Sequence, residues 1–130
     1  MNLLSWNCQG LGVSLTVKKL KDECLKNKPH IVFLMETKQK NSYVTKIRKK
    51  CKFTNEWMVN PIGISGGLAL WWNDDLIVNI LSSSNNVIHT SVSGSNFEVP
   101  KYLTFVYGPT DEGDRLLCWD YITKIACHIN

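Results

Sequence analysis

Short apolar runs alternate with lysine-rich segments along the first third of the chain. The runs "NLLSW" (residues 2–6) and "HIVFLME" (residues 30–36) predict two strands. The second run is apolar on successive residues, so both faces of that strand should be covered. Between the runs, "LTVKKLKDECLKN" (residues 15–27) has apolar side chains at helical spacing and predicts a helix that Asn27 and Pro29 end.

The rest of the sequence predicts a basic helix, several strands and a last helix. "NSYVTKIRKKCK" (residues 41–52) is the basic helix, with Asn41 or Ser42 as its N-cap. The strand candidates are "NEWMVNP", "SGGLALWW", "LIVNILSS", "NVIHTSVSG" and "NFEVPKYLTFVYG", with "SGSN" as the turn before the last one. The segment 110–129 has the spacing of a C-terminal helix. This order predicts an α/β (α+β) fold in which one mostly antiparallel sheet carries helices on one side.

Length and composition narrow the class of protein. The chain has 130 residues and 44% hydrophobic content, which fits one domain with a core. No stretch of about 18 uninterrupted apolar residues occurs, so we expect a soluble intracellular protein without a membrane span. The five cysteines form no C-x-x-C pair, which disfavours a zinc site and predicts reduced thiols.

The net charge of +4 conceals an uneven distribution. From Lys18 to Lys52 there are 12 Lys and Arg against 3 Asp and Glu, whereas from Phe53 onward there are 3 against 8. A basic region attracts phosphate backbones, and this attraction weakens as salt is added. The same lysines would also suit the solvated faces of two helices, so charge alone leaves both interpretations open.

Three polar residues stand where apolar strands end. Asn7 follows "LLSW", Glu36 follows "IVFLM" and Tyr107 follows "LTFV". A carboxylate beside an amide oxygen suits Mg²⁺, which prefers oxygen ligands and keeps several waters, and a tyrosine hydroxyl can donate to a phosphate oxygen. Three other interpretations remain open at this point: Asn7 as a cap, Glu36 paired with Lys38 or Lys40, and Tyr107 as a core residue.

The order of four motifs resembles the endonuclease/exonuclease/phosphatase superfamily, and most of all the endonuclease domain of non-LTR (LINE-type) retrotransposons. The motifs are "LLSWNCQGLG", "KPHIVFLMETK", "GGLALWW" and "LTFVYGPTDEGDRLLCWDYI". The resemblance implies an Mg²⁺-dependent DNA endonuclease, with Mn²⁺ as an alternative ion, and a nuclear location. It also implies that Glu36 is the metal ligand, that Asn7 helps to bind the metal and the scissile phosphate, and that Tyr107 contacts the phosphate.

Two elements of that family do not occur in the sequence. The "G-D-x-N" element and the "S-D-H" element position the water, stabilise the leaving group and supply a histidine in the family. Here the only Gly-Asp pair, Gly113-Asp114, is followed by Arg115, and His128 has no Asp beside it. We therefore expect residues 1–130 to be a partial domain, truncated before both elements and catalytically incomplete.

The resemblance also implies a fold, which is one half of a four-layered α/β/β/α sandwich. If this half contributes one sheet, the sheet face formed by "GGLALWW" and "LTFVYG" is apolar and uncovered, and it is a surface for self-association. Two alternatives to an endonuclease follow from the missing elements. The chain could be a non-catalytic nucleic-acid-binding or interaction module, or the inert product of a decayed mobile element.

Overall fold

The computed structural model describes residues 2–63, 65–94 and 99–108. Its elements in chain order are β1 (Leu3–Asn7), α1 (Ser14–Asn27), β2 (Ile31–Met35), α2 (Asn41–Lys50), β3 (Asn55–Val59), β4 (Leu68–Trp72), β5 (Leu76–Ser83), β6 (Val87–Gly94) and β7 (Lys101–Val106). These elements confirm the helices and strands predicted for this part of the chain. The predicted C-terminal helix and part of the "SGSN" turn lie outside the described residues.

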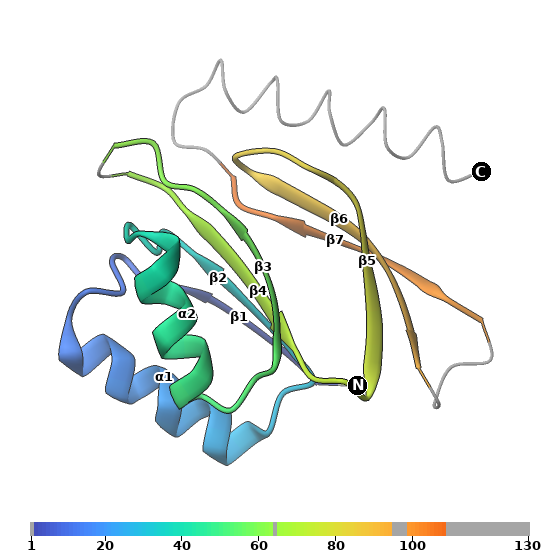
Figure 1. Ribbon diagram of the computed structural model, residues 1–130, viewed down its shortest axis with the longest axis horizontal. Helices are drawn as coiled ribbons and strands as arrows, with labels where there is room; N and C mark the ends of the chain where they lie inside the picture. The colour runs from blue at the N-terminus through green and yellow to red at the C-terminus, as the bar shows by residue number, and fades with distance from the viewer. Residues whose placement is uncertain (1, 64, 95–98, 109–130) are drawn as a thin grey trace.

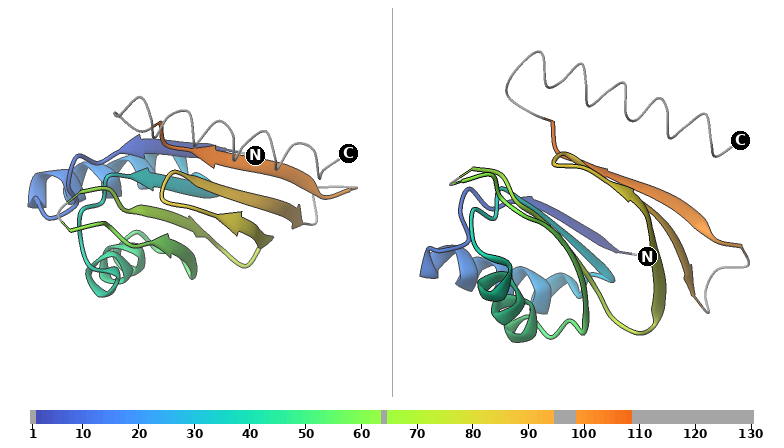
Figure 2. Two further views of the ribbon diagram at one scale, coloured as in Figure 1. Left: turned by 90° about the horizontal axis from the view of Figure 1, so that it is seen from above. Right: turned by 45° about the horizontal axis from the view of Figure 1, so that its top comes forward.

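The strands are divided between two sheets. The first has the order β1-β2-β4-β3, and only its β1–β2 pair is parallel; the second has the antiparallel order β5-β6-β7. Both helices lie on one side of the first sheet and the second sheet lies on the other side, as two views show (Figures 1 and 2). The predicted α/β class with mostly antiparallel strands is confirmed. The expectation of a single sheet is corrected to two.

The helices cover one face of the first sheet. Trp71 of β4 and Val32 and Leu34 of β2 are fully buried there, and Leu20 of α1 and Ile47 of α2 pack onto them. Because β2 has its other residues on the opposite face, this packing accounts for only half of its apolar run. The other half must be covered from the second sheet.

The second sheet covers the opposite face of the first one. Phe33, Leu68 and Leu70 from the first sheet form a buried cluster with Ile88 and Phe105 from the second. The rings of Phe33 and Phe105 meet with their centroids 5.3 Å apart and a tilt of 47°. The expectation that the "GGLALWW" and "LTFVYG" face is uncovered is therefore wrong, and the basis for self-association through this face is removed.

Neither helix has a side chain that caps its N-terminus by a hydrogen bond. Helix α1 ends at Asn27 as predicted, and Lys28 adopts a left-handed conformation (φ 45°) while its N–H donates to the Cys24 carbonyl at 3.0 Å. Helix α2 is preceded by the extended residue Lys40, and no side chain caps it. The predicted N-cap at Asn41 or Ser42 is wrong, because both residues are already inside the helix.

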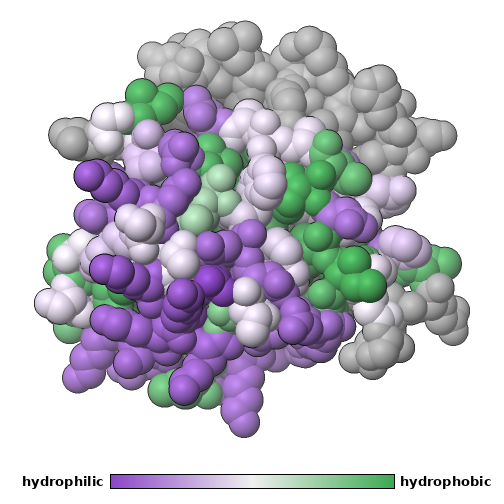
Figure 3. Space-filling view, in the orientation of Figure 1, coloured by the Kyte–Doolittle hydropathy of each residue, from purple (hydrophilic) through white to green (hydrophobic). Residues whose placement is uncertain are grey.

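One basic residue of α2, Arg48, connects the helix to β3 and to the loop before it. Arg48 is buried, and its Nε lies 2.7 Å from a carboxylate oxygen of Glu56 on β3. Its Nη1 donates to the carbonyl oxygens of Phe53 and Thr54 at 2.9 and 2.6 Å. The remaining surface over α1 and α2 is largely hydrophilic (Figure 3). Neither of these two helices is long and apolar enough to cross a membrane.

Candidate active site

The parallel pairing of β1 and β2 brings their carboxyl ends to the same edge of the first sheet. Asn7 is in register with Met35, so Glu36 follows directly beside the end of β1. The pairing continues into the loops, because the N–H of Gly10 donates to the Glu36 carbonyl at 2.8 Å and that of Leu11 to the Thr37 carbonyl at 2.9 Å. The backbone around Glu36 is thus fixed from the β1 side.

A second loop fixes Glu36 from the β4 side. The Thr37 N–H donates to the Gly67 carbonyl at 3.2 Å, and the Lys38 N–H donates to the Gly66 carbonyl at 3.0 Å. Gly67 has a φ of +93°, and a Cβ at this position would collide with the Thr37 hydroxyl. Only glycine allows the chain to approach Glu36 so closely here.

The backbone at this edge is strained. Glu36 itself has a φ of 54°, and Gln9 and Lys38 have φ values of 50° and 56°. Non-glycine residues rarely adopt this left-handed conformation, and such residues cluster at functional sites. At Glu36 this conformation ends the extended backbone of β2.

Tyr107 reaches Glu36 from the second sheet. Its N–H donates to the Asn86 carbonyl at 2.7 Å, and its ring packs against the cluster between the sheets. Its hydroxyl donates a hydrogen bond to Oε1 of Glu36. This bond raises the pKa of Tyr107 to about 12, and burial adds to the effect. Two of the three predicted site residues are therefore in direct contact, although 71 positions separate them in the sequence.

Asn7 lies at the same edge of the first sheet. Its register partner Met35 packs between the sheets, so the Asn7 side chain stands on that face as well. Its Oδ1 accepts the N–H of Gln9 at 3.1 Å, which is the local capping role left open above. Among the described residues, no hydrogen bond joins Asn7 to Glu36 or Tyr107. An amide oxygen has a second lone pair, so this bond leaves it able to bind a ligand.

Cys8 lies near the site although nothing in the sequence analysis pointed to it, whereas Lys38 and Lys40 were already candidates as partners of Glu36. Cys8 is buried, and burial together with the negative charge of Glu36 raises its pKa to about 12. Lys38 and Lys40 line a cavity of about 580 Å³ that also borders Asn60 and Pro61. Within the described part of the chain neither lysine forms an ion pair with Glu36, so the expected alternative of a Glu36–lysine pair is not found.

The oxygen atoms at this edge fit a hydrated Mg²⁺ ion. Oε1 of Glu36 accepts the Tyr107 hydroxyl, and the second carboxylate oxygen of Glu36 and the Asn7 amide oxygen, at the same end of β1 and β2, are further possible metal ligands. The residues that the structure describes contain no group of three or more His, Cys, Asp and Glu that could enclose a metal. Mg²⁺ commonly binds through one or two carboxylates and keeps several waters, so an open site of this kind suits it.

The chain belongs to the endonuclease/exonuclease/phosphatase family, whose model matches residues 4–127. A search of the curated proteins gave no significant match. Solved structures confirm the fold.

Three solved structures are similar over almost the whole chain. The AP endonuclease LMAP from Leishmania major matches with a TM-score of 0.62 and 16% identity, over 88% of this chain and 43% of that one. The endonuclease domain of TRAS1, a telomere-specific non-LTR retrotransposon, matches with a TM-score of 0.63 and 16% identity, over 99% and 53%. The 3′ phosphatase NExo from Neisseria, bound to product DNA hairpin, matches with a TM-score of 0.60 and 17% identity, over 95% and 50%. The chain thus spans about half the length of the structures it matches.

The contact between Tyr107 and Glu36 predicts that the Tyr107 hydroxyl ionises at a higher pH than that of an ordinary tyrosine. In metal-free buffer, Tyr107 should lose its proton near pH 12, whereas an ordinary tyrosine does so near pH 10. Because the folded-state pKa is raised, the contact stabilises the fold below pH 10 and its contribution is lost as the pH rises from 10 to 12. Phenolate absorbance of the chain minus that of Tyr107→Phe measures this titration.

The Glu36→Gln variant is the control for the cause of this shift. Its neutral amide cannot hold the phenol proton as a carboxylate does, so the pKa of Tyr107 should fall toward 10. A Tyr107 titration that is the same in both proteins would contradict the contact.

Proposed function

We propose that the chain forms the metal- and phosphate-binding part of the active centre of a DNA endonuclease of the non-LTR retrotransposon type. The observation that carries this proposal is the hydrogen bond from Tyr107 to Glu36 at the edge where β1 and β2 end. The family match and the likeness to the TRAS1 endonuclease domain support it. A DNA substrate also supports the nucleus as the place where the protein acts.

Each of the three residues has a distinct role in this proposal. Glu36 is the anionic ligand of Mg²⁺, or of Mn²⁺ in its place, and Asn7 offers its amide oxygen to the ion and its amide N–H to the scissile phosphate. The ion, when bound, orients the phosphate and stabilises the charge that develops on it. Tyr107 is protonated at any physiological pH, so its hydroxyl can turn from Glu36 to a phosphate oxygen.

The cavity lined by Lys38 and Lys40 supports DNA as the substrate. Lys38 and Lys40 line it and follow Glu36 by only two and four positions. Since neither is neutralised by an acid within the described residues, both are available to a phosphate backbone. The NExo structure with its product DNA hairpin shows that a protein of this fold binds DNA.

The proposed function predicts two separable parts of DNA binding. A labelled duplex should bind more tightly in Mg²⁺ than in EDTA, and Glu36→Gln should remove this difference while the salt-sensitive part, due to the lysines, remains. The matched control is Asp22→Asn, which removes an exposed carboxylate from α1 and should keep the Mg²⁺ effect. Fluorescence anisotropy at a series of salt concentrations measures both parts.

The competing functions give different results in the same titration. Binding that does not respond to Mg²⁺ or to Glu36→Gln would favour a non-catalytic nucleic-acid-binding module. The absence of any binding would favour an inert product of a decayed element.

We expect no nicking of supercoiled plasmid by residues 1–130 in Mg²⁺. The sequence contains neither the "G-D-x-N" nor the "S-D-H" element, so the attacking water lacks the matched base and orienting groups that typically contribute about 10²-fold to 10⁴-fold. Gel electrophoresis of plasmid incubated with the chain and with Glu36→Gln measures this. Nicking by the chain and not by the variant would mean that these residues complete a site without both elements.

A further inference from the structure

A second cavity lies at the opposite end of the first sheet from Glu36. Its volume is about 570 Å³, and it is formed where α1 and α2 end, beside His30 at the start of β2. Glu36 lies at the other end of β2, about 20 Å from His30 if each of the six residue steps between them advances the chain as in an extended strand. The proposed active centre therefore does not include this cavity.

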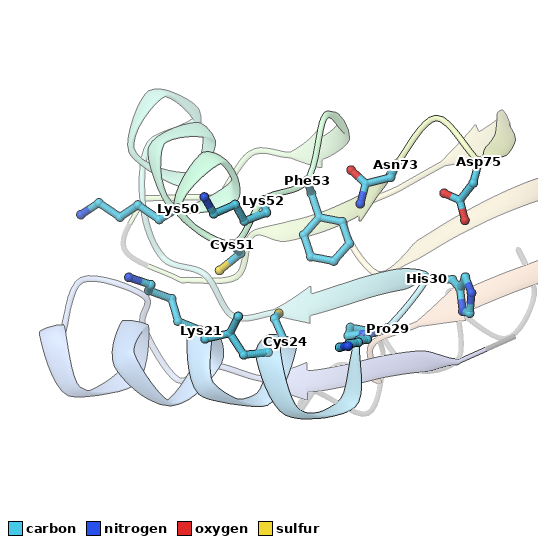
Figure 4. A pocket seen from close by; sticks show the side chains of 12 residues that line it. Lys21, Cys24, Pro29, His30, Lys50, Cys51, Lys52, Phe53, Asn73 and Asp75 are labelled. Carbon is cyan, nitrogen blue, oxygen red and sulfur yellow. The ribbon is translucent and has the colours of Figure 1, made fainter.

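Two thiols form part of the wall of this cavity. Cys24 is in the last turn of α1, and Cys51 directly follows α2. Their sulfur atoms point toward each other in the close view (Figure 4). Both side chains belong to the buried cluster under the helices and line the same cavity, and both residues are reduced. The two thiols therefore lie close together, although they come from different helices.

The charges around the two thiols distinguish them. Lys21 lies near Cys51, and Lys50 and Lys52 line the same cavity. The hydrogen bond from Cys24 and the positive charge of Lys21 lower the pKa of Cys51, whereas the same bond and burial raise the pKa of Cys24. Thiolates, not thiols, are the nucleophiles, so Cys51 is the reactive member of the pair.

We propose that Cys24 and Cys51 are a dithiol site that reacts with hydrogen peroxide to form a disulfide between α1 and α2. The Cys51 thiolate attacks one peroxide oxygen, the O–O bond breaks, and hydroxide leaves and takes up a proton to become water. The Cys24 sulfur then attacks the Cys51 sulfenic acid, the S–O bond breaks, and a second water leaves with the Cys24 proton. In sum, two thiols and one peroxide give one disulfide and two waters.

The cavity makes this reaction accessible. Each cysteine keeps 8% of its surface exposed, and both border the cavity of about 570 Å³, which is large compared with a peroxide molecule. The third described thiol, Cys8, offers a contrast, because it is buried beside Glu36 and its pKa is raised to about 12. A thiol of that kind should resist the same oxidant.

The disulfide would join two helices that pack on the same face of the first sheet and would close a loop around β2. It constrains the unfolded chain, so the oxidised protein should unfold at a higher denaturant concentration than the reduced one. The link lies at the far end of β2 from Glu36 and leaves that centre unchanged.

The experiment uses a variant in which Cys8, Cys118 and Cys127 are replaced by serine, so that only the proposed pair remains. One equivalent of hydrogen peroxide should remove both free thiols, lower the intact mass by two hydrogen atoms, and give a peptide that links Cys24 to Cys51. The unchanged chain should give the same linked peptide. Circular dichroism shows that each protein is folded before it is oxidised.

Single replacements test the order of the reaction. Cys24→Ser should leave a Cys51 sulfenic acid that dimedone traps, whereas Cys51→Ser should give no dimedone adduct at Cys24. Retention of both free thiols in the folded two-cysteine variant, under peroxide that oxidises the urea-unfolded chain, would overturn the proposal. A linked peptide that joins other cysteines in the unchanged chain would do the same.

Discussion

Replacing Glu36 with glutamine should weaken Mn²⁺ binding by at least about 100-fold. Removing a residue that only orients a metal ligand typically weakens metal binding by about 10-fold to 100-fold, and removing the charge of a direct ligand should cost at least as much. Glutamine keeps the size of the side chain and one carbonyl oxygen but removes the negative charge. Glu36 is the carboxylate at the edge where β1 and β2 end, with Oε1 already bound to Tyr107. Electron paramagnetic resonance of free Mn²⁺ measures the affinity directly.

The interpretation of this result depends on two controls. Asp22→Asn removes one carboxylate from the exposed surface of α1 and should leave the affinity unchanged. Competition by Mg²⁺ should displace the Mn²⁺ from the unchanged chain. Equal affinities in Glu36→Gln and the unchanged chain would place the cation elsewhere and remove the proposed metal centre.

Replacing Phe33 with alanine should lower the free energy of unfolding by about 3–5 kcal/mol, the usual cost of truncating a buried phenylalanine. Phe33 is 2% exposed and lies between the sheets, where it meets Phe105 of β7. The change leaves a void in the cluster that joins the two sheets. Urea unfolding followed by tryptophan fluorescence measures the loss.

A double-mutant cycle shows whether the two sheets pack as described. Phe33→Ala and Phe105→Ala should be coupled by about 0.5–1.5 kcal/mol, as expected for an aromatic pair. Phe53→Ala should add to Phe105→Ala without coupling, because Phe53 packs with Trp71 in the cluster under the helices. A loss below about 1 kcal/mol for Phe33→Ala would mean that the second sheet does not cover the first.

The division into two sheets could have been read from β4. Its run "LALWW" is apolar on successive residues, as β2 is, and this pattern predicts cover on both faces. Leu68 and Leu70 indeed face the second sheet, while Ala69 and Trp71 face the helices. What the sequence could not show is where the chain changes sheet. The composition of the turn after Trp72 does not indicate whether the next strand pairs with the first sheet or starts a second one.

The residues of the candidate site could be predicted from the sequence, but the contacts between them could not. Asn7 and Glu36 were singled out because each follows an apolar strand, and the parallel pairing of β1 and β2 brings both to the same edge of the first sheet. The contact between Tyr107 and Glu36 joins the two sheets, so it depends on packing that no local pattern encodes. The left-handed backbone of Glu36 was also unpredictable, since glutamate has no preference for it. The same holds for Cys24 and Cys51, which two helix ends bring together.

The location of bound Mn²⁺ tests the central claim most directly. A paramagnetic ion broadens the amide signals of nearby residues, so substoichiometric Mn²⁺ added to ¹⁵N-labelled chain should erase the signals of Gly10, Leu11, Glu36 and Thr37 first. The signals around His30, at the other end of β2, should persist. This is the result that a cation site at Glu36 requires. Early broadening around Asp74 and Asp75, the adjacent carboxylates in the turn between β4 and β5, or uniform broadening along the chain, would contradict it.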